Sequence, residues 1–244
     1  MIKLALDLVV SISIMILLGP FLLVVLLIVY FQDFHNPLYI AERIGKNGKT
    51  FNMYKIRSMI IDAELTGVDS TSNDDDRITK VGKFIRKFKI DELSQLINVI
   101  IGNMSLVGPR PNVSRETDLY TTVEKEILSI KPGITDFSSI IFSDEGEILE
   151  GSSDPDLDYN QLIRPWKSRL ALVYIDKRSI FLDLYILFLT AISFINRDFS
   201  RRRISRYLAS IRSDAELVNV TLRKGPLKKG VPPGGKQVVS SRNI

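Results

Sequence analysis

The chain opens with a long stretch that carries no charge. Between Leu8 and Gln32 the residues are dominated by Leu, Ile and Val, and no polar face recurs at helical spacing. A helix of about 25 residues would be ~37 Å long, which is enough to cross a hydrocarbon core of ~30 Å. The run is too long for the apolar part of a signal peptide, and no small-residue cleavage site follows it. The pattern predicts a membrane-embedded helix over residues 1–34.

Gly19 and Pro20 interrupt this apolar run near its middle. Proline lacks a backbone donor and its ring clashes with the carbonyl of Ile16, so the helix should kink or break there. Each arm would then be ~16–18 Å long, about half the thickness of a bilayer. The helix can span the bilayer with a kink, or it can enter, turn and leave on the same side. Lys3 before the run and Arg43 after it place positive charge at both ends. This weakly favours the second arrangement, but the pattern leaves both open.

The residues after the apolar run alternate in short stretches typical of strands. Asn47 and Gly48 form a turn signal between residues 39–44 and 50–56, which predicts a β-hairpin. Residues 67–77 are polar and acidic, and they are typical of a surface loop.

Helical spacing dominates the rest of the chain. Apolar residues recur every three or four positions over residues 81–88 and again over 90–100, and a further helix is expected over 117–129. The fold class expected is therefore α+β and predominantly helical, with a membrane-embedded helix, a small β-hairpin element and a helical catalytic domain.

Two stretches near the C-terminus suggest helices at a membrane surface. Asp183 interrupts an apolar run over residues 180–195, whose uncharged part is too short to span a bilayer. Four arginines follow at once, with apolar residues at helical spacing, which fits either an amphipathic helix on anionic lipid or a solvated face of a packed helix. We expect membrane-interfacial helices near residues 180–211 and a catalytic domain over 35–212. Residues 213–244, basic and rich in Pro and Gly, are predicted to be a disordered tail.

Composition narrows the chemistry. The chain has no cysteine and one histidine, which excludes disulfides and thiolate metal sites. Its formal net charge of +5 suits an anionic partner, whether nucleic acid, lipid headgroups or a phosphorylated substrate. Glycine-rich phosphate loops of the Walker or dinucleotide type do not occur, which argues against those enzyme classes.

Asp91 and Glu92 are the most suggestive acidic pair. Acids in the first turn of a helix ordinarily complement the helix dipole, but here the cations Arg86, Lys87 and Lys89 precede the pair closely. Adjacent carboxylates on a helix point ~100° apart, so one can attack while its neighbour holds a cation. A carboxylate that attacks a phosphoryl group forms an acyl phosphate, and the reaction needs a divalent metal and cationic side chains. Hard oxygen ligands and phosphate favour Mg²⁺ over zinc.

A second suggestive segment places Arg110 between Pro109 and Pro111. The two prolines restrict the backbone on either side, so the guanidinium is displayed from a stiff segment. A planar guanidinium suits bidentate contact with phosphate. An exposed arginine in a helix-terminating turn would give the same local pattern.

Taken together, these segments resemble the bacterial sugar transferase family, the monotopic phosphoglycosyl transferases, in order, spacing and content. The resemblance extends from the membrane segment to about Arg206, and it is carried by four stretches: residues 42–59 (ERIGKNGKTFNMYKIRSM), 82–111 (containing IDELSQLINVIIGNMSLVGPRP), 131–135 (KPGIT) and 174–190 (YIDKRSIFLDLYILFLT). The sequence is similar to the compact form of the family, without the multi-span N-terminal domain of longer members.

The resemblance implies a reaction. A sugar-1-phosphate is transferred from a UDP-sugar to a polyprenyl phosphate such as undecaprenyl phosphate, with release of UMP, as the initiating step of bacterial glycoconjugate assembly. Asp91 matches the family's nucleophile, which forms a covalent phosphosugar intermediate. Glu92 matches the Mg²⁺-binding partner, so Asp91 and Glu92 are the candidate metal site.

Further roles follow from the same resemblance. Arg86 matches an arginine that engages phosphate, and Pro109, Arg110 and Pro111 match the segment that cradles the nucleotide. Lys55 and Arg57 are carried over as phosphate contacts. The family also implies a re-entrant membrane helix, with the catalytic domain on the cytoplasmic face of the bacterial inner membrane and with no nucleic-acid partner. Oligomeric state is left open, a homodimer included.

Some positions depart from the family pattern. Ser94 stands where proline often follows the acidic pair, which predicts a looser start of that helix. Residues 136–139 (DFSS) replace small apolar residues, and this segment is a candidate for influencing the choice of sugar. Two other functions also fit the residues: a noncatalytic membrane scaffold that gathers anionic lipid carriers, and a metal-dependent phosphohydrolase that uses Asp91.

Overall fold

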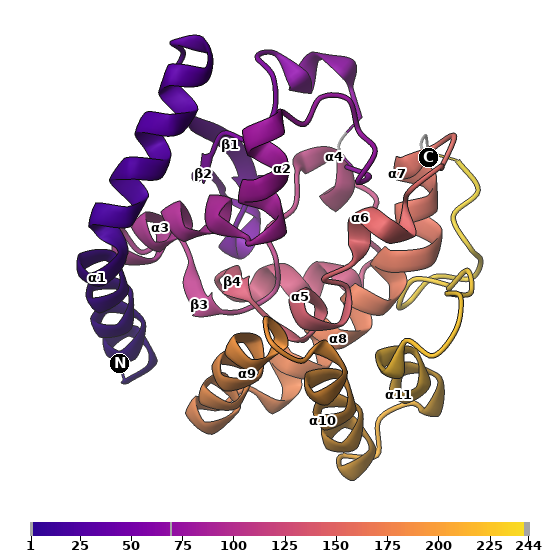
Figure 1. The fold of residues 1–244 in the computed structure, drawn as a ribbon. Helices are drawn as coiled ribbons and strands as arrows, with labels where there is room; N and C mark the ends of the chain where they lie inside the picture. The colour runs from indigo at the N-terminus through magenta and orange to yellow at the C-terminus, as the bar shows by residue number, and fades with distance from the viewer. Residues whose placement is uncertain (1, 69, 242–244) are drawn as a thin grey trace.

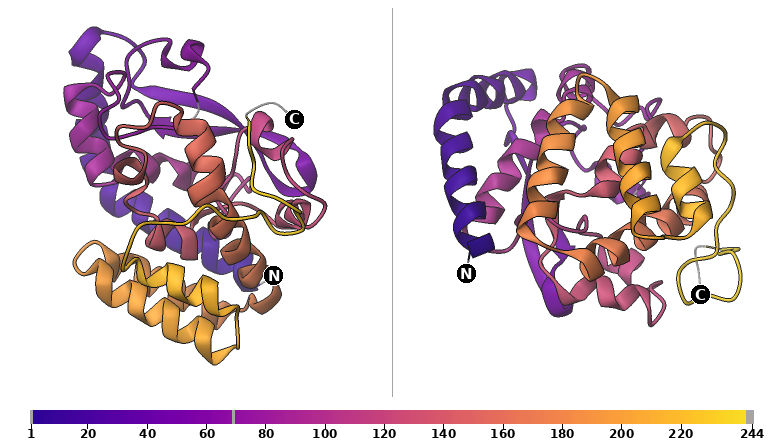
Figure 2. Two further views of the ribbon diagram at one scale, coloured as in Figure 1. Left: turned by 90° about the vertical axis from the view of Figure 1, so that its right-hand side faces the viewer. Right: turned by 90° about the horizontal axis from the view of Figure 1, so that it is seen from below.

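A computed structural model describes residues 2–68 and 70–241, and a single long helix lies along one edge of it (Figure 1). This helix, α1 (Ile2–Asp33), contains Pro20 and bends part-way along its length (Figure 2, right), as proline in a helix interior requires. Most of its large apolar side chains are exposed, with Ile16 at 74% and Leu17 at 77%. The helix is therefore no ordinary core helix, and its length and composition suit a bilayer.

Both ends of α1 are tied to the same globular body. Near its start, the ammonium of Lys3 lies 2.6 Å from a carboxylate oxygen of Asp183. At its end, the guanidinium of Arg57 donates to Asp33, with Nη2 2.6 Å from Oδ1. The apolar middle of the helix thus lies between two polar attachments.

The predicted hairpin is confirmed. Strands β1 (Leu38–Ile44) and β2 (Thr50–Ile56) pair antiparallel, with Leu38 opposite Ile56 and Ile44 opposite Thr50. The short helical turn η1 (Lys46–Gly48) joins them, and both Asn47 and Gly48 have positive φ angles. These are the residue types that adopt this conformation most easily.

The helix predicted over residues 81–88 is present as α2 (Lys80–Lys87). The next one starts as the 3₁₀ helix η3 (Ile90–Gln95) and continues as α3 (Leu96–Ile100). Between them Lys89 has a φ of 52°, in the left-handed region that side chains seldom adopt. This residue ends α2 and turns the chain into η3.

A second pair of strands was not predicted. Strand β3 (Ser105–Val107) runs parallel to β4 (Gly133–Thr135), and each is only three residues long. Strands this short carry too little alternation to be recognised in a sequence.

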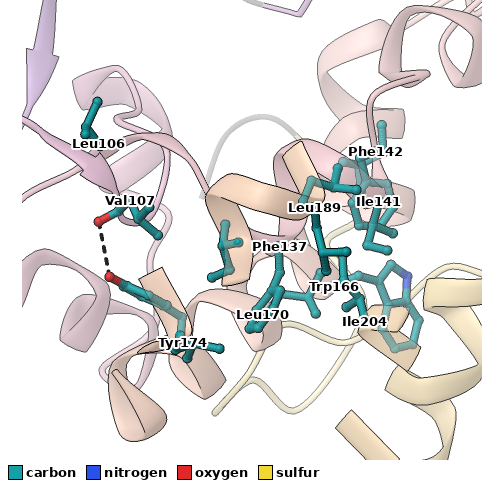
Figure 3. Packing of buried hydrophobic residues seen from close by; sticks show 14 of the residues in the cluster. Leu106, Val107, Phe137, Ile141, Phe142, Trp166, Leu170, Tyr174, Leu189 and Ile204 are labelled. Carbon is teal, nitrogen blue, oxygen red and sulfur yellow. Dashed lines mark hydrogen bonds between the residues drawn. The ribbon is translucent and has the colours of Figure 1, made fainter. Parts of the chain in front are cut away.

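Helices complete the chain around a common core. They are η2 (Ala63–Thr66), α4 (Ser114–Thr117), η4 (Glu124–Ser129), α5 (Phe137–Ile141), α6 (Glu145–Ile148), α7 (Pro155–Asp158), η5 (Tyr159–Ile163), α8 (Arg164–Lys177), α9 (Ile180–Ser193), α10 (Arg197–Ser210) and α11 (Ala215–Leu222). Figure 3 shows how Phe137, Leu170 and Leu189 meet in the interior, while the hydroxyl of Tyr174 donates to the carbonyl of Val107 at 3.1 Å.

The single helix predicted over residues 117–129 is wrong, because α4 ends at Thr117 and η4 begins only at Glu124. The second segment has its own start signal. The hydroxyl of Thr121 accepts from the amide of Glu124 at 3.1 Å, and the carboxylate of Glu124 accepts from the amide of Thr121 at 3.0 Å. This reciprocal capping box begins a new helix instead of continuing the old one.

The two helices predicted at the membrane surface differ from each other. Helix α9 exposes large apolar residues, including Phe181 at 84%. In α10, by contrast, Ile204 and Leu208 are fully buried and Arg201 lies 3.2 Å from Asp144. The apolar face of α10 is therefore used for packing within the protein. Helix α9 also buries the core residues Leu182 and Leu189, but its outer side leaves large apolar side chains exposed, where they can meet lipid.

The C-terminal residues also differ from the predicted disordered tail. Within residues 213–241, α11 buries Leu217 against the body, and the extended chain after it is hydrogen-bonded to α8 and η5. Gln161 donates to the carbonyl of Val239 at 2.6 Å, and Trp166 donates to that of Lys228 at 3.4 Å. Backbone carbonyls make these contacts, so residue composition does not reveal them. Residues 1, 69 and 242–244, which fall in the predicted membrane helix, surface loop and tail, lie outside the described residues.

The attachment at the end of α1 yields a stability prediction. Arg57 is only 7% exposed, so Asp33→Ala leaves a buried guanidinium without its carboxylate. We expect the free energy of unfolding to fall by about 3 kcal/mol, as measured by chemical denaturation in detergent micelles. The exposed Glu64→Ala is the control, with an expected change within about 0.5 kcal/mol. Equal, small losses in the two variants would contradict the role given to this ion pair.

Candidate active site

The acidic pair lies where η3 meets the hairpin. Asp91 in the first turn of η3 is buried, and its Oδ2 lies 2.9 Å from the ammonium of Lys55 on β2. Successive residues of a strand point to opposite faces, so Lys55 faces η3 only because the register of β2 against η3 is fixed. The structure thus brings together two of the residues selected from the sequence.

Two side chains hold η3 and α3 against the edge of β2. Asn98 accepts from the amide of Tyr54 at 2.9 Å and donates to the carbonyl of Asn52 at 2.7 Å, as a neighbouring strand would. The hydroxyl of Ser94 lies 3.1 Å from the carbonyl of Tyr54 and 3.2 Å from that of Asp91. Ser94 therefore docks the start of this helix, contrary to the looser start expected from the missing proline.

Glu92 has a separate cationic partner. Arg110 Nη2 lies 2.6 Å from Glu92 Oε1. Burial alone would raise the pKa of the Glu92 carboxyl, but the charges of Arg110, Lys89 and Lys55 outweigh it and hold that pKa well below its usual range. Glu92 is consequently ionised at neutral pH.

The segment that carries Arg110 is held by the residues around β4. The amide of Gly133 donates to the carbonyl of Pro109 at 2.9 Å, and the amide of Gly108 donates to that of Thr135 at 3.0 Å. The two glycines touch so closely that a Cβ at Gly133 would lie 2.1 Å from the backbone nitrogen of Gly108. Two motifs far apart in sequence, GPRP and KPGIT, therefore form one rigid unit. Pro109, Arg110 and Pro111 line a small cavity beside it.

Arg57 and Arg86, two of the expected phosphate contacts, differ in their surroundings. Arg57 is bound to Asp33, and its Nε donates to the carbonyl of Asn36 at 2.9 Å, so it fastens α1 to the hairpin. Arg86 is half-buried in the last turn of α2. Burial alone would raise the pKa of Asp75, but its hydrogen bonds with Arg77 and, to a smaller extent, the charge of Arg86 hold that pKa low. Because its guanidinium is engaged by Asp33 and Asn36, Arg57 is not part of the proposed substrate-binding set. The role of Arg86 stays a prediction.

Other charged residues lie near the acidic pair, since the charge of Lys167 acts on Lys89 and that of Glu145 acts on Arg110. Lys167 on α8 pairs with Glu145 on α6, and Lys89 lies beside the acidic pair, with its ammonium 3.3 Å from the carbonyl of Ser139. Lys89 belongs to the cationic cluster noticed in the sequence, whereas no sequence signal marks Lys167 and Glu145, because they are distant in the chain.

Asp91 and Glu92 can contribute to a magnesium site. The described residues contain no cluster of three or more His, Cys, Asp or Glu suited to a metal ion. Mg²⁺, however, is commonly held by one or two carboxylates together with substrate phosphates and water. Each carboxylate uses one oxygen for its cationic partner in the ion pairs described above, so the donor set fits Mg²⁺ bound jointly with a phosphorylated substrate.

Comparison with known proteins identifies the family of the chain. The family model for bacterial sugar transferases matches residues 1–197, which include every element of the site. The chain belongs to the bacterial sugar transferase family. The family match covers α1, the hairpin, the acidic pair, GPRP and α9.

Individual relatives support the same assignment. A galactosyl transferase, CpsE, from Streptococcus agalactiae is 39% identical over 170 residues, covering 65% of this chain and 34% of its own length. An undecaprenyl-phosphate galactose phosphotransferase from Salmonella typhimurium is 35% identical, covering 79% of this chain and 40% of its own length. An exopolysaccharide production protein, PSS, from Rhizobium leguminosarum is 34% identical, covering 80% of this chain and 96% of its own length. The chain thus spans about a third to two-fifths of the first two relatives.

The Glu92–Arg110 pair predicts a pH-dependent loss of stability. The pKa of Glu92 is lower in the folded protein than in the unfolded chain, so its ionised form stabilises the fold above about pH 4.5. That contribution disappears as the pH falls through the folded-state pKa. Arg110→Met should therefore lower the free energy of unfolding by about 2 kcal/mol at pH 7, and by less at pH 3.

Thermal and chemical denaturation at both pH values measure this difference. Arg202→Met, which removes an exposed guanidinium from α10, should change stability little at either pH. A deficit in Arg110→Met that grows as the pH falls would contradict the assignment.

Proposed function

We propose that the protein transfers a sugar-1-phosphate from a UDP-sugar to polyprenyl phosphate, with Asp91 as the nucleophile. One observation carries the proposal: the adjacent carboxylates of buried Asp91 and half-buried Glu92 are each paired with a cation from a different family motif, Lys55 and Arg110. Relatives named for undecaprenyl-phosphate sugar phosphotransfer support the substrate class.

In the first half-reaction, a carboxylate oxygen of Asp91 attacks the β-phosphorus of the UDP-sugar. A bond forms between this oxygen and the phosphorus, and the bond from the phosphorus to the bridging oxygen breaks, so UMP leaves with the electron pair. The product is a phosphosugar joined to Asp91 as an acyl phosphate. No proton transfer is needed, since the departing phosphate is a stable anion.

The cations around the pair suit this step. The negative charge of Asp91 is consumed when its oxygen bonds to phosphorus, and Lys55, 2.9 Å away in the free protein, can then pair with the phosphate oxygens instead. Arg110, held by GPRP and KPGIT, is suited to the nucleotide phosphates. A magnesium ion held by Glu92 and Asp91 would supply further neutralisation of the diphosphate.

In the second half-reaction, an oxygen of polyprenyl phosphate attacks the phosphorus of the intermediate. The bond to Asp91 breaks, the carboxylate is restored, and the lipid leaves as a polyprenyl diphosphate-sugar. This step needs a lipid acceptor next to the site, and α1, which carries the exposed apolar surface, lies beside the hairpin that holds Lys55 (Figure 1).

Asp91→Asn tests the covalent mechanism. The amide is a poor nucleophile, so UMP release from a UDP-sugar should fall at least ~10³-fold, while membrane retention persists. Exposed Asp176→Asn is the matched control, with normal activity expected. Mass spectrometry of wild-type protein with UDP-sugar alone should detect a phosphosugar on Asp91. Normal turnover in Asp91→Asn would remove the mechanism. No UMP release even from the wild-type protein would indicate a noncatalytic scaffold, and lipid-independent release of sugar phosphate would indicate a hydrolase.

We also propose that α1 is re-entrant and that the catalytic domain lies on the cytoplasmic face of the bacterial inner membrane. The support is that Lys3 and Asp33, near the two ends of α1, both bind the same globular body. A spanning helix would put its ends on opposite sides of a ~30 Å core. The bend of α1 at its proline gives the turn that a re-entrant path needs.

Single-cysteine labelling tests this topology, because the natural chain has no cysteine. Ile2→Cys and Lys46→Cys should both be shielded from a membrane-impermeant thiol reagent in intact cells and labelled after permeabilisation. Labelling of only one position in intact cells would mean that α1 spans the bilayer.

A further inference from the structure

Lys89 differs from the other cations at the acidic pair. Lys55 and Arg110 each lie within 3 Å of a carboxylate oxygen, and Lys167 is paired with Glu145. Among residues 2–68 and 70–241, Lys89 has no carboxylate within ion-pair distance. Its ammonium has one hydrogen bond at 3.3 Å, to the neutral carbonyl of Ser139.

The backbone holds Lys89 in this position. Its φ of 52° is unfavourable for a residue with a side chain, and the carbonyl of Lys89 accepts from the amide of Glu92 at 3.2 Å, which joins it to the first turn of η3. Strained conformations of this kind persist where the surroundings enforce them, and they are concentrated at functional sites.

Electrostatics agrees with the geometry. The charge of Lys89 acts on Glu92 more strongly than that of Lys55 does, which places its ammonium close to the acidic pair. The Lys89 side chain is half-buried. An ammonium that is partly desolvated and lacks a matching anion is suited to one brought by a ligand.

We propose that Lys89 binds the phosphate group that is transferred. This inference rests on the proposed function, because it assigns Lys89 to the phosphorus that Asp91 attacks. The same phosphate is present in both half-reactions, first as the β-phosphate of the nucleotide sugar and then as the phosphosugar on Asp91. Ser139, whose carbonyl holds the ammonium, belongs to the DFSS segment that departs from the family pattern.

Comparison of UDP and UMP binding tests the proposal without any covalent chemistry. UDP contains the β-phosphate and UMP lacks it. In Mg²⁺-containing buffer, Lys89→Asn in the full-length protein should weaken UDP binding by about 10–100-fold, as expected for loss of a charge-assisted contact. UMP binding should change less than about twofold. Asparagine suits this test because it tolerates the left-handed backbone conformation.

Matched variants separate binding from folding. Lys87→Asn removes an exposed ammonium two residues away and should leave both affinities unchanged, while Lys89→Arg should restore the preference for UDP. Equal losses of UDP and UMP affinity in Lys89→Asn, or no loss of either, would overturn the proposal. If Asp91 never forms an adduct in the wild-type protein, the proposed function fails, and the UDP and UMP comparison still decides the role of Lys89.

The two half-reactions distinguish the sources of phosphate. Lys89→Asn should slow adduct formation from UDP-sugar alone, and also discharge of the adduct to a short-chain prenyl phosphate, each by about tenfold or more. Slowing of discharge alone would assign Lys89 to the lipid phosphate, and slowing of adduct formation alone would assign it to the nucleotide. Either of these results would overturn a contact with the transferred group.

Discussion

Docking of η3 and α3 on the open edge of β2 is the interaction on which the site depends. Asn98 satisfies the backbone of that edge as a neighbouring strand would, and Ser94 adds a contact from the turn that carries Asp91. If this register slipped by one residue, Lys55 would point to the opposite face of the strand. The carboxylate of Asp91 would then be buried without a cation, which is a costly arrangement.

A second constraint is charge balance. Four cations and three carboxylates surround the site, from six different segments: Lys55, Lys89, Arg110, Lys167, Asp91, Glu92 and Glu145. Three of the cations are matched by carboxylates in the free protein, and the remaining positive charge is the property that an anionic substrate requires. Close packing of Gly108 on Gly133 limits how far the GPRP segment can adjust, so the position of Arg110 is preorganised.

Much of the fold and of the acidic site could be predicted from the sequence, because the signals that mark them are local. Turn residues marked the hairpin, helical spacing marked α2, and the motifs marked Asp91, Glu92, Lys55 and Arg110. Other features depend on tertiary contacts that no local pattern encodes. Arg57 was expected at phosphate, but its partner Asp33 lies on a different element, and the path of the C-terminal residues is set by backbone carbonyls. Assignment of the chemistry to Asp91 came from family resemblance, since an acidic pair in a first turn is common in unrelated helices.

The two attachments of α1 have a consequence for how the proposed lipid substrate is encountered. A membrane segment fastened at both ends cannot swing away from the body that it supports, so the depth of the acidic pair relative to the lipid headgroups is constant. Under the proposed function, the carrier then reaches the site by lateral diffusion, without lifting its chain out of the bilayer. The rate of the second step would follow the surface density of carrier molecules in the leaflet, and dilution of the surrounding solution would leave it unchanged.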